Sequence, residues 1–184
     1  MIQLTREEAI SLVKSHVESN NLVNHMIATG AVMKALAYKF GEDENEWEIT
    51  GILHDYDYPE TDQDPAHHGL LSVEMLKKYN LPKEVYDAIL AHAEKKTLET
   101  KIEKALYVAD PTTGFITAAA LIRSEKKLEP LDSKFLMKRF KEKSFARGAN
   151  REQMSMCSEL GFELESYLNL ALDAMKSIHE EIGL

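Results

Sequence analysis

The sequence is poor in cysteine, glycine and proline, and it has no long uninterrupted hydrophobic run. A single cysteine, Cys157, excludes an internal disulfide framework, favours a reducing compartment and is interpreted as an ordinary thiol. Eight Gly and five Pro in 184 residues are few, whereas a β-sandwich or β-barrel of this length would need many turns. No apolar stretch approaches the roughly 20 residues that span a bilayer, so no membrane association is expected.

Positive charge is also in the minority. Lys and Arg number 22 against 31 Asp and Glu, which gives a formal net charge of −9. This balance argues against nonspecific binding to a nucleic acid polymer or an anionic membrane, but bound cations would still allow a small phosphorylated substrate. Glu7 and Glu8 stand where a signal peptide would need apolar residues, so we expect a cytoplasmic protein.

Helical periodicity is the dominant pattern in the chain. The capping-box spacing of Thr5 and Glu8 predicts a first helix, and Pro111 is expected to end another. No stretch alternates with period two, so the fold class is predicted to be all-α. Further helices are predicted over about residues 21–40, 44–54, 65–79, 101–109 and 113–122, with one that begins at Pro82 and a polar break at 56–65.

The composition changes after Arg123. Residues 124–129 are a charged connector, 133–143 predict a short basic helix, and Asn150 or Arg151 begins a last helical stretch that includes a long helix over about 162–181. With no internal repeat or low-complexity linker, we predict one domain over 1–184, with a core at about 20–122 and a helical extension at about 123–184. The last helix could complete the core or form a dimer contact, and the sequence leaves the oligomeric state open.

Histidine and aspartate recur at helix positions that are otherwise apolar. His25 lies within a predicted helix, His54-Asp55 follows 29 residues later at a helix end, and Asp110 ends the apolar run Ala105–Ala109. An ionised Asp at the end of such a run is costly to bury unless a cation or donor compensates it. Two imidazoles and two carboxylates suit a divalent metal such as Mn, Fe or Zn, and the alternative is a coincidental set of polar core residues.

This order of residues resembles the H…HD…D signature of the HD superfamily of metal-dependent phosphohydrolases. The resemblance covers roughly residues 20–120 and implies an HD-domain helical bundle. It is closer still to the subgroup with extra histidines, because His68 precedes Ser72-Val73-Glu74-Met75-Leu76 and His92 lies within Ile89-Leu90-Ala91-His92-Ala93-Glu94. The resemblance implies one metal on His25, His54, Asp55 and Asp110, and a second on His68 and His92, with Asp55 bridging the two.

The remaining histidines are assigned other roles. His67 competes with His68 as a ligand, and the helix register favours His68, which leaves His67 as an exposed or outer residue. His16 and His179 lie on charged helices and are predicted to be solvated.

The sequence departs from the common HDIG form directly after His54-Asp55. That form continues with an apolar residue, Gly and often Lys, whereas this chain has Tyr56, Asp57 and Tyr58. A Lys that would help to hold a phosphate is therefore missing. Asp57 could orient a ligand histidine or cap the following turn, and the sequence does not separate these two roles.

The resemblance implies hydrolysis of a small phosphate ester or nucleotide, with Asp55 and His54 as catalytic residues that act through a metal-activated water. The implied cofactors are divalent metal ions, two in number, with Fe or Mn favoured and Zn, Mg, Co or Ni also possible. Two alternatives stay open: a mixed-valent di-iron HD-fold oxygenase, which would use the same ligands, and a noncatalytic nucleotide-binding HD module.

The most basic stretch runs over residues 138–147 and is followed by Arg151. We expect Lys143, Ser144, Arg147 and Arg151 to hold the phosphate or a carboxylate of the substrate, since Arg can do so bidentately. The alternative is a solvated charged surface. Replacing Arg147 with alanine separates the two, because only the first predicts a higher KM without loss of metal.

Overall fold

The computed structural model describes residues 4–61 and 64–184, and within these two ranges it contains helices, turns and loops but no strand. The prediction of an all-α protein is therefore confirmed. None of the helices in these ranges has both the length and the apolar composition needed to cross a membrane. The elements are α1 (Arg6–His16), α2 (Asn20–Phe40), α3 (Glu44–Leu53), α4 (Tyr58–Thr61), α5 (Leu70–Leu76), η1 (Lys77–Tyr79), α6 (Lys83–His92), α7 (Lys101–Leu121), α8 (Ser133–Phe140), α9 (Arg151–Ser155), η2 (Met156–Leu160), α10 (Leu164–Ser177) and α11 (His179–Ile182).

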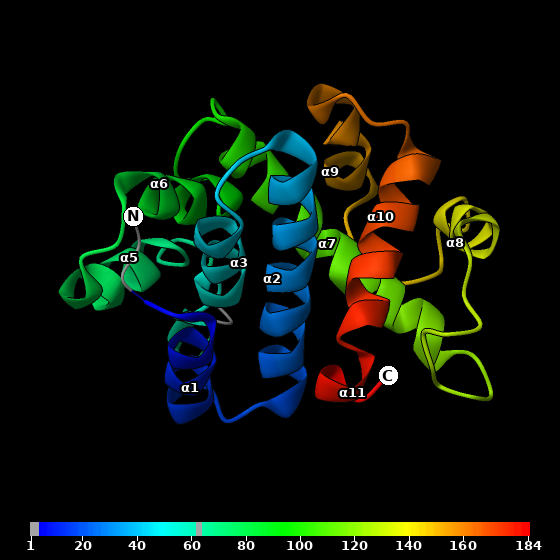
Figure 1. The fold of residues 1–184 in the computed structure, drawn as a ribbon, viewed down its shortest axis with the longest axis horizontal. Helices are drawn as coiled ribbons and strands as arrows, with labels where there is room; N and C mark the ends of the chain where they lie inside the picture. The colour runs from blue at the N-terminus through cyan, green and yellow to red at the C-terminus, as the bar shows by residue number, and fades with distance from the viewer. Residues whose placement is uncertain (1–3, 62–63) are drawn as a thin grey trace.

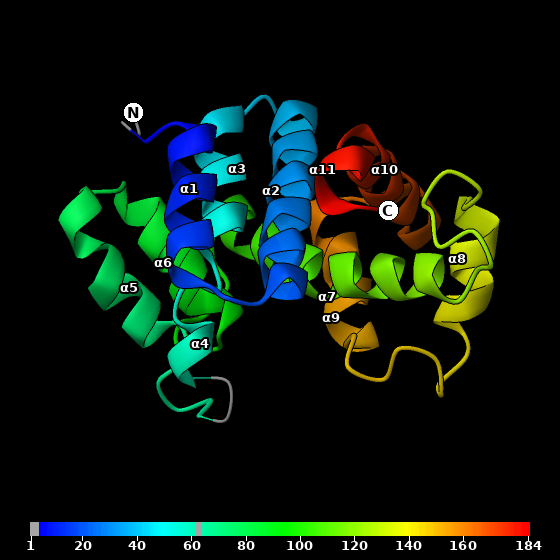
Figure 2. The same cartoon turned by 90° about the horizontal axis from the view of Figure 1, so that it is seen from below.

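Helix α2 lies at the centre of the bundle. Figure 1 shows α3 and α1 on one side of it and α10 on the other, and α2 packs against α3, α7 and α10. Helix α7 passes behind α2 and extends toward α8, so it contacts both the N-terminal and the C-terminal helices (Figure 2). The apolar faces of these elements form one core, whose fully buried side chains include Met26, Ile27, Met33, Leu36, Ile49, Leu106, Phe115 and Tyr167.

Two glycines allow the backbones of α2 and α3 to approach closely. A Cβ atom added to Gly51 would lie 2.7 Å from the Cα atom of Gly30 and 2.8 Å from the carbonyl carbon of Thr29. Contacts this short leave no space for a side chain, so the approach depends on glycine. It brings His25, near the start of α2, close to His54 and Asp55 at the end of α3.

Replacing Gly51 with alanine is therefore expected to destabilise the protein. The added methyl meets backbone rather than a flexible side chain, and such overpacking costs about 3 kcal/mol, or roughly 10 °C in Tm for a domain of this size. Thermal unfolding measures the effect. Gly114→Ala is the matched control, because a Cβ atom on Gly114 has no neighbour within 4 Å and alanine favours the helix. Equal Tm values for the two variants would contradict this account of the α2–α3 contact.

The predicted helix break at Pro111 is wrong. Helix α7 continues through Pro111 from Lys101 to Leu121. A proline inside a helix destabilises it by about 3 kcal/mol. Fully burying one large apolar side chain stabilises the fold by about 1.5–3 kcal/mol. Because α7 buries several such side chains on both sides of the proline, among them Leu106, Phe115 and Ile116, the burial outweighs this cost. The hydroxyl group of Thr112 also donates to the carbonyl oxygen of Val108 (2.7 Å) beside this position.

The helix predicted from Pro65 begins later in the structure. Residues 65–69 form turns, and α5 starts at Leu70 because Gly69 adopts a left-handed backbone conformation, with φ +78°. His68 therefore lies in a turn and not on a helix. The polar break at 56–65 contains the single turn α4, and residues 62–63 of that segment lie outside the described residues.

The C-terminal extension completes the core. Helix α10 packs against α2, α7 and α8, and it buries Leu168, Leu172 and Met175. Of the two roles left open for the last helix, the structure therefore shows the first. Two predicted helices were too long. The basic helix predicted to residue 143 ends at Phe140, and the helix predicted over about 162–181 is divided at Ile178 into α10 and α11.

Candidate metal centre

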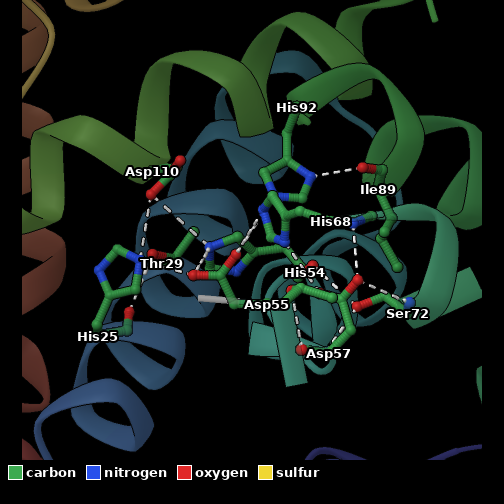
Figure 3. A network of polar contacts seen from close by, with 12 residues as sticks. His25, Thr29, His54, Asp55, Asp57, His68, Ser72, Ile89, His92 and Asp110 are labelled. Atoms are coloured by element: carbon green, nitrogen blue, oxygen red, sulfur yellow. Dashed lines mark hydrogen bonds and ion pairs between the residues drawn. The ribbon is translucent and has the colours of Figure 1, made fainter. Parts of the chain in front are cut away.

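The six predicted metal ligands lie together where five segments of the bundle meet (Figure 3). His25 comes from α2, His54 and Asp55 directly follow α3, His68 lies in the turn before α5, His92 is the last residue of α6, and Asp110 lies in the middle of α7. Residues up to 85 positions apart in the sequence thus share one site. The side chains of His54 and His92 are almost completely buried, whereas those of His25 and Asp110 reach the surface.

The carboxylate of Asp55 lies between two pairs of histidines. Its Oδ2 atom is 3.7 Å from His25 Nε2 and 3.3 Å from His54 Nε2. Its Oδ1 atom is 3.4 Å from His68 Nε2 and 3.3 Å from His92 Nε2. Each oxygen of one carboxylate therefore faces its own pair of imidazole nitrogens, which is the geometry of a bridging ligand.

Asp110 lies on the side of His25 and His54 only. Its Oδ1 atom is 3.1 Å from His25 Nε2 and 3.8 Å from His54 Nε2. His25, His54 and Asp110 offer ligand atoms within 4.8 Å of one another, and so do His54, Asp55 and His92. Either group, both of which include His54, could hold a metal ion.

Each of the four histidines has a hydrogen-bond partner at its other ring nitrogen. Nδ1 of His54 is 2.8 Å from the carbonyl oxygen of Gly51, and Nδ1 of His92 is 2.5 Å from that of Ile89. Nδ1 of His68 lies 3.0 Å from Asp57 Oδ1, and Nδ1 of His25 lies 3.0 Å from Thr113 Oγ1.

These partners determine which nitrogen is free to bind a metal. Carbonyl and carboxylate oxygens only accept hydrogen bonds, so Nδ1 must donate in His54, His68 and His92. The hydroxyl of Thr113 donates to the carbonyl oxygen of Asp110 (3.0 Å) and so accepts from His25. In the neutral form, all four rings then direct an unprotonated Nε2 toward the carboxylates, as metal-ligating histidines do.

One atom of the cluster is unsatisfied without an ion. His54 Nε2 is fully buried and has no hydrogen-bond partner, although Asp55 and Asp110 face it. A buried polar atom without a partner is unusual in a native protein and calls for an explanation such as an ion. The donor set of imidazole nitrogens and carboxylate oxygens fits a divalent transition metal.

The electrostatics of the cluster favour ionised carboxylates. Burial by itself raises the pKa of Asp55, but the facing imidazoles of His54 and His92 outweigh burial and hold that pKa well below its usual value. Burial likewise lowers the pKa of His54, and the carboxylates of Asp55 and Asp110 outweigh it and raise that pKa. The carboxylates are thus held in the ionised form in which they bind a cation.

Asp57 takes the first of the two roles that the sequence left open, because it orients His68; its side chain caps α5 and not the turn that follows Asp57. Its side chain is fully buried; Oδ1 accepts from His68 Nδ1, and Oδ2 accepts from the backbone N–H groups of Gly69 (2.8 Å) and Ser72 (3.0 Å). The Ser72 hydroxyl in turn accepts from the backbone N–H of Asp57 (2.9 Å). One carboxylate therefore orients a predicted ligand histidine and caps the start of α5.

The other three histidines lie outside the cluster. His67 is exposed and pairs with Asp64 (2.6 Å), and His179 is also exposed, as expected. His16 differs from its predicted solvated state: its ring packs 4.5 Å from that of Tyr56, and Nε2 lies 3.1 Å from Glu60. Proximity to Tyr56 in the folded chain could not be inferred from the charged helix on which His16 lies.

Cys157 is buried, and burial raises the pKa of its thiol to about 11, which fits the ordinary thiol inferred from the sequence.

Three of the predicted substrate-binding residues, Lys143, Ser144 and Arg147, lie in the loop between α8 and α9. We call this loop, residues 141–150, the basic loop. The fourth, Arg151, is the first residue of α9. Arg151 is not free to bind a phosphate, because its guanidinium donates to the carbonyl oxygens of Phe140, Phe145, Ala146 and Ala149 at distances of 2.6–3.4 Å. The structure corrects its role to that of organising the loop. Lys143, Ser144 and Arg147 are exposed, and Lys143 and Arg147 line a hollow that includes none of the six metal-ligand candidates.

Sequence reasoning missed the partners that orient the histidines. Two of them had a recognisable signal, because His54 and His92 lie at helix ends, where Nδ1 can reach the carbonyl oxygen three residues earlier. Thr113 had none, because it is 88 residues from His25 and meets it only through the packing of α7 on α2.

The chain matches the family described as HD domain over residues 22–134. Among curated proteins it is similar to Ribonuclease Y of Thermoanaerobacter pseudethanolicus, with 27% identity over 168 residues that cover 88% of this chain and 32% of that protein. Ribonuclease Y of Geotalea uraniireducens is 26% identical over 167 residues, 89% of this chain and 32% of the relative. This chain thus spans about a third of the length of these relatives. No solved structure matches it significantly.

Proposed function

The chain belongs to the HD domain family, and from this premise we propose that it is a metal-dependent phosphohydrolase that cleaves a small phosphate ester or nucleotide with water. The observation that carries the proposal is the position of Asp55, whose two carboxylate oxygens face separate pairs of histidines. Such a carboxylate supports a centre of two divalent ions, of which Fe and Mn are the favoured candidates.

The residues of the chain would hold this centre in a fixed geometry. His25, His54, Asp55 and Asp110 would form one half, and His68 and His92 would complete the other with Asp55. The two ions would supply a nucleophile at neutral pH, by lowering the pKa of a coordinated water, and would neutralise charge on the phosphoryl oxygens. The hydrogen bonds at the four Nδ1 atoms keep the imidazoles aimed at the centre during this reaction.

Hydrolysis would break one P–O bond of the ester. Oxygen from water would join phosphorus, and the organic group would leave as an alcohol after it gains a proton. Asp55 and His54 act as catalytic residues only through the centre, since His54 is buried and has no route to the substrate of its own. The side chains of His25 and Asp110 border the solvent-accessible edge, which supports substrate entry on that side.

A second candidate is cleavage of the phosphodiester bonds of RNA. It is favoured by the likeness to Ribonuclease Y, although the chain covers only 32% of the length of that relative and carries a net charge of −9. The expectation that the protein binds no nucleic acid polymer therefore argues against this candidate. An RNA oligonucleotide should be tested as a substrate beside the phosphate ester.

We expect phosphate release from a simple ester to require a divalent metal and no oxygen. The test incubates the protein with 4-nitrophenyl phosphate under anaerobic conditions, with Mn²⁺ or Fe²⁺ and, in parallel, with a chelator. Release that stops with chelator supports the proposal. Turnover of an organic substrate only in the presence of O₂ would favour the di-iron oxygenase instead, and tight nucleotide binding without turnover in any metal would favour a noncatalytic module.

A further inference from the structure

A cleft of ≈ 360 Å³ opens at the accessible edge of the metal centre. His25 and Asp110 line one end of it, so any molecule bound at the centre borders the cleft. The rest of the lining consists of small residues from α7 and from the basic loop, and we call this space the loop cleft. These residues are Pro111, Gly114, Ala118, Ala146, Gly148 and Ala149.

The α7 side of the loop cleft offers no polar side chain beyond Asp110. Gly114 and Ala118 follow Asp110 at intervals of four residues, and they therefore lie on the same face of the helix. A Cβ atom added to Gly114 has no neighbour within 4 Å, so the space beside this face is open. The helix thus presents a smooth apolar wall that begins at a predicted metal ligand.

The loop side likewise offers no polar side chain, because its lining residues are Ala146, Gly148 and Ala149. The carbonyl oxygens of Ala146 and Ala149 accept from Arg151 at 3.0 and 2.7 Å, and that of Phe145 accepts at 2.6 Å. The guanidinium carbon of Arg151 also lies 4.6 Å from the ring centroid of Phe115, which is buried beneath this region. Arg151 therefore ties the basic loop to α7, together with the ring of Phe145, whose centroid lies 5.6 Å from that of Phe115.

This lining discriminates between kinds of organic group. A sugar in the loop cleft would give up hydrogen bonds to water and find few partners, which is unfavourable. An aryl or alkyl group would remove apolar surface from water at no such cost.

We propose that the loop cleft binds the apolar organic group of the substrate, an aryl or alkyl group attached to the phosphoryl centre, and that Arg151 is a positioning residue that holds the cleft wall. The inference rests on the proposed function, because it assumes that the phosphoryl group lies at the metal centre. Arg151 itself does not contact the substrate in this arrangement, since its donors are bonded to the loop.

The test compares the binding of phenylphosphonate and methylphosphonate, which are not esters and are not hydrolysed, to the metal-loaded protein by isothermal titration calorimetry. The methyl group is too small to fill the loop cleft, whereas the phenyl ring reaches into it. We expect the wild-type protein to prefer phenylphosphonate about tenfold. Gly114→Leu fills the open space, so it should remove the preference for phenylphosphonate and leave the affinity for methylphosphonate unchanged. Thr117→Leu is the control: it lies on the same helix but outside the cleft lining, and it should keep the preference.

Arg151→Lys tests the positioning role. Lysine cannot donate to four carbonyl oxygens at once, so the loop should move and the preference should fall about fivefold with the affinity for methylphosphonate retained. Arg139→Lys is the matched control, because Arg139 also lies against a phenylalanine ring but pairs with Glu142 and not with the loop carbonyls. A Tm measurement on both variants separates local loop movement from a general loss of stability.

The outcomes distinguish this inference from the proposed function. Equal affinities for the two phosphonates in the wild-type protein, no binding of either, or a preference unaffected by Gly114→Leu would overturn it. A clear preference with no hydrolysis of any phosphate ester would support the loop cleft and instead reject the phosphohydrolase.

Discussion

Replacing Asp55 with alanine is expected to remove metal from both halves of the centre at once. Among the residues that the structure describes, Asp55 is the one side chain with an oxygen within 3.3–3.7 Å of both histidine pairs. Its loss leaves two sets of imidazoles with no shared anion between them. If the centre activates water as proposed, hydrolysis should fall about 1000-fold or more, since metal ions supply several kcal/mol of transition-state stabilisation.

Elemental analysis of protein purified without added metal or chelator measures this effect directly. The wild-type chain should carry about two Fe or Mn ions, Asp55→Ala should carry close to none, and the double variant His68→Ala, His92→Ala should retain about one. The double variant is the control, because it removes two ligands but leaves His25, His54, Asp55 and Asp110 in place. One ion or fewer in reconstituted wild-type protein, unaffected by the double substitution, would leave only a mononuclear site.

Asp57→Ala is expected to weaken metal binding and folding together. Removal of the carboxylate leaves two buried backbone N–H groups, of Gly69 and Ser72, without an acceptor and frees the ring of His68 to rotate. Each unsatisfied buried group costs about 1–3 kcal/mol, so we expect a loss of about 3 kcal/mol in the free energy of unfolding. Loss of a partner that orients a metal ligand typically costs about 10–100-fold in affinity, here for the ion that we propose at His68.

Chemical denaturation and metal titration, carried out on the same protein, separate the two effects. Asp64→Ala is the matched control, since Asp64 also accepts a hydrogen bond from a histidine, His67, but both side chains are exposed. That variant should keep both stability and metal affinity within error. If Asp57→Ala lost stability but kept the wild-type affinity for the second ion, Asp57 would be a helix cap only, and its bond to His68 would have no part in metal binding.

Several features of the protein followed from the sequence by itself. Local hydrogen-bonding patterns have their partners within a few residues, so the capping box of Thr5 and Glu8 could be predicted and is present. Imidazole and carboxylate at helix positions that are otherwise apolar require a reason, which indicated His25, His54, Asp55 and Asp110 as candidate ligands. The candidate roles of His68 and His92 came from the family resemblance. The spacing of these residues resembled a known metal-binding family, and the chain matches that family.

The tertiary structure decided what local sequence could not. Pro111 breaks an isolated helix, yet α7 continues through it because the apolar side chains on both sides are buried by other helices. Arg151 has the chemistry of a phosphate-binding residue, but the fold surrounds its guanidinium with carbonyl oxygens. Asp57 could cap the following turn or be the partner of a histidine, and only the position of α5 beside the centre makes it the partner of His68 and the cap of α5. In each case the outcome depends on long-range burial and on which groups remain unpaired after packing, and neither can be inferred from neighbours in the chain.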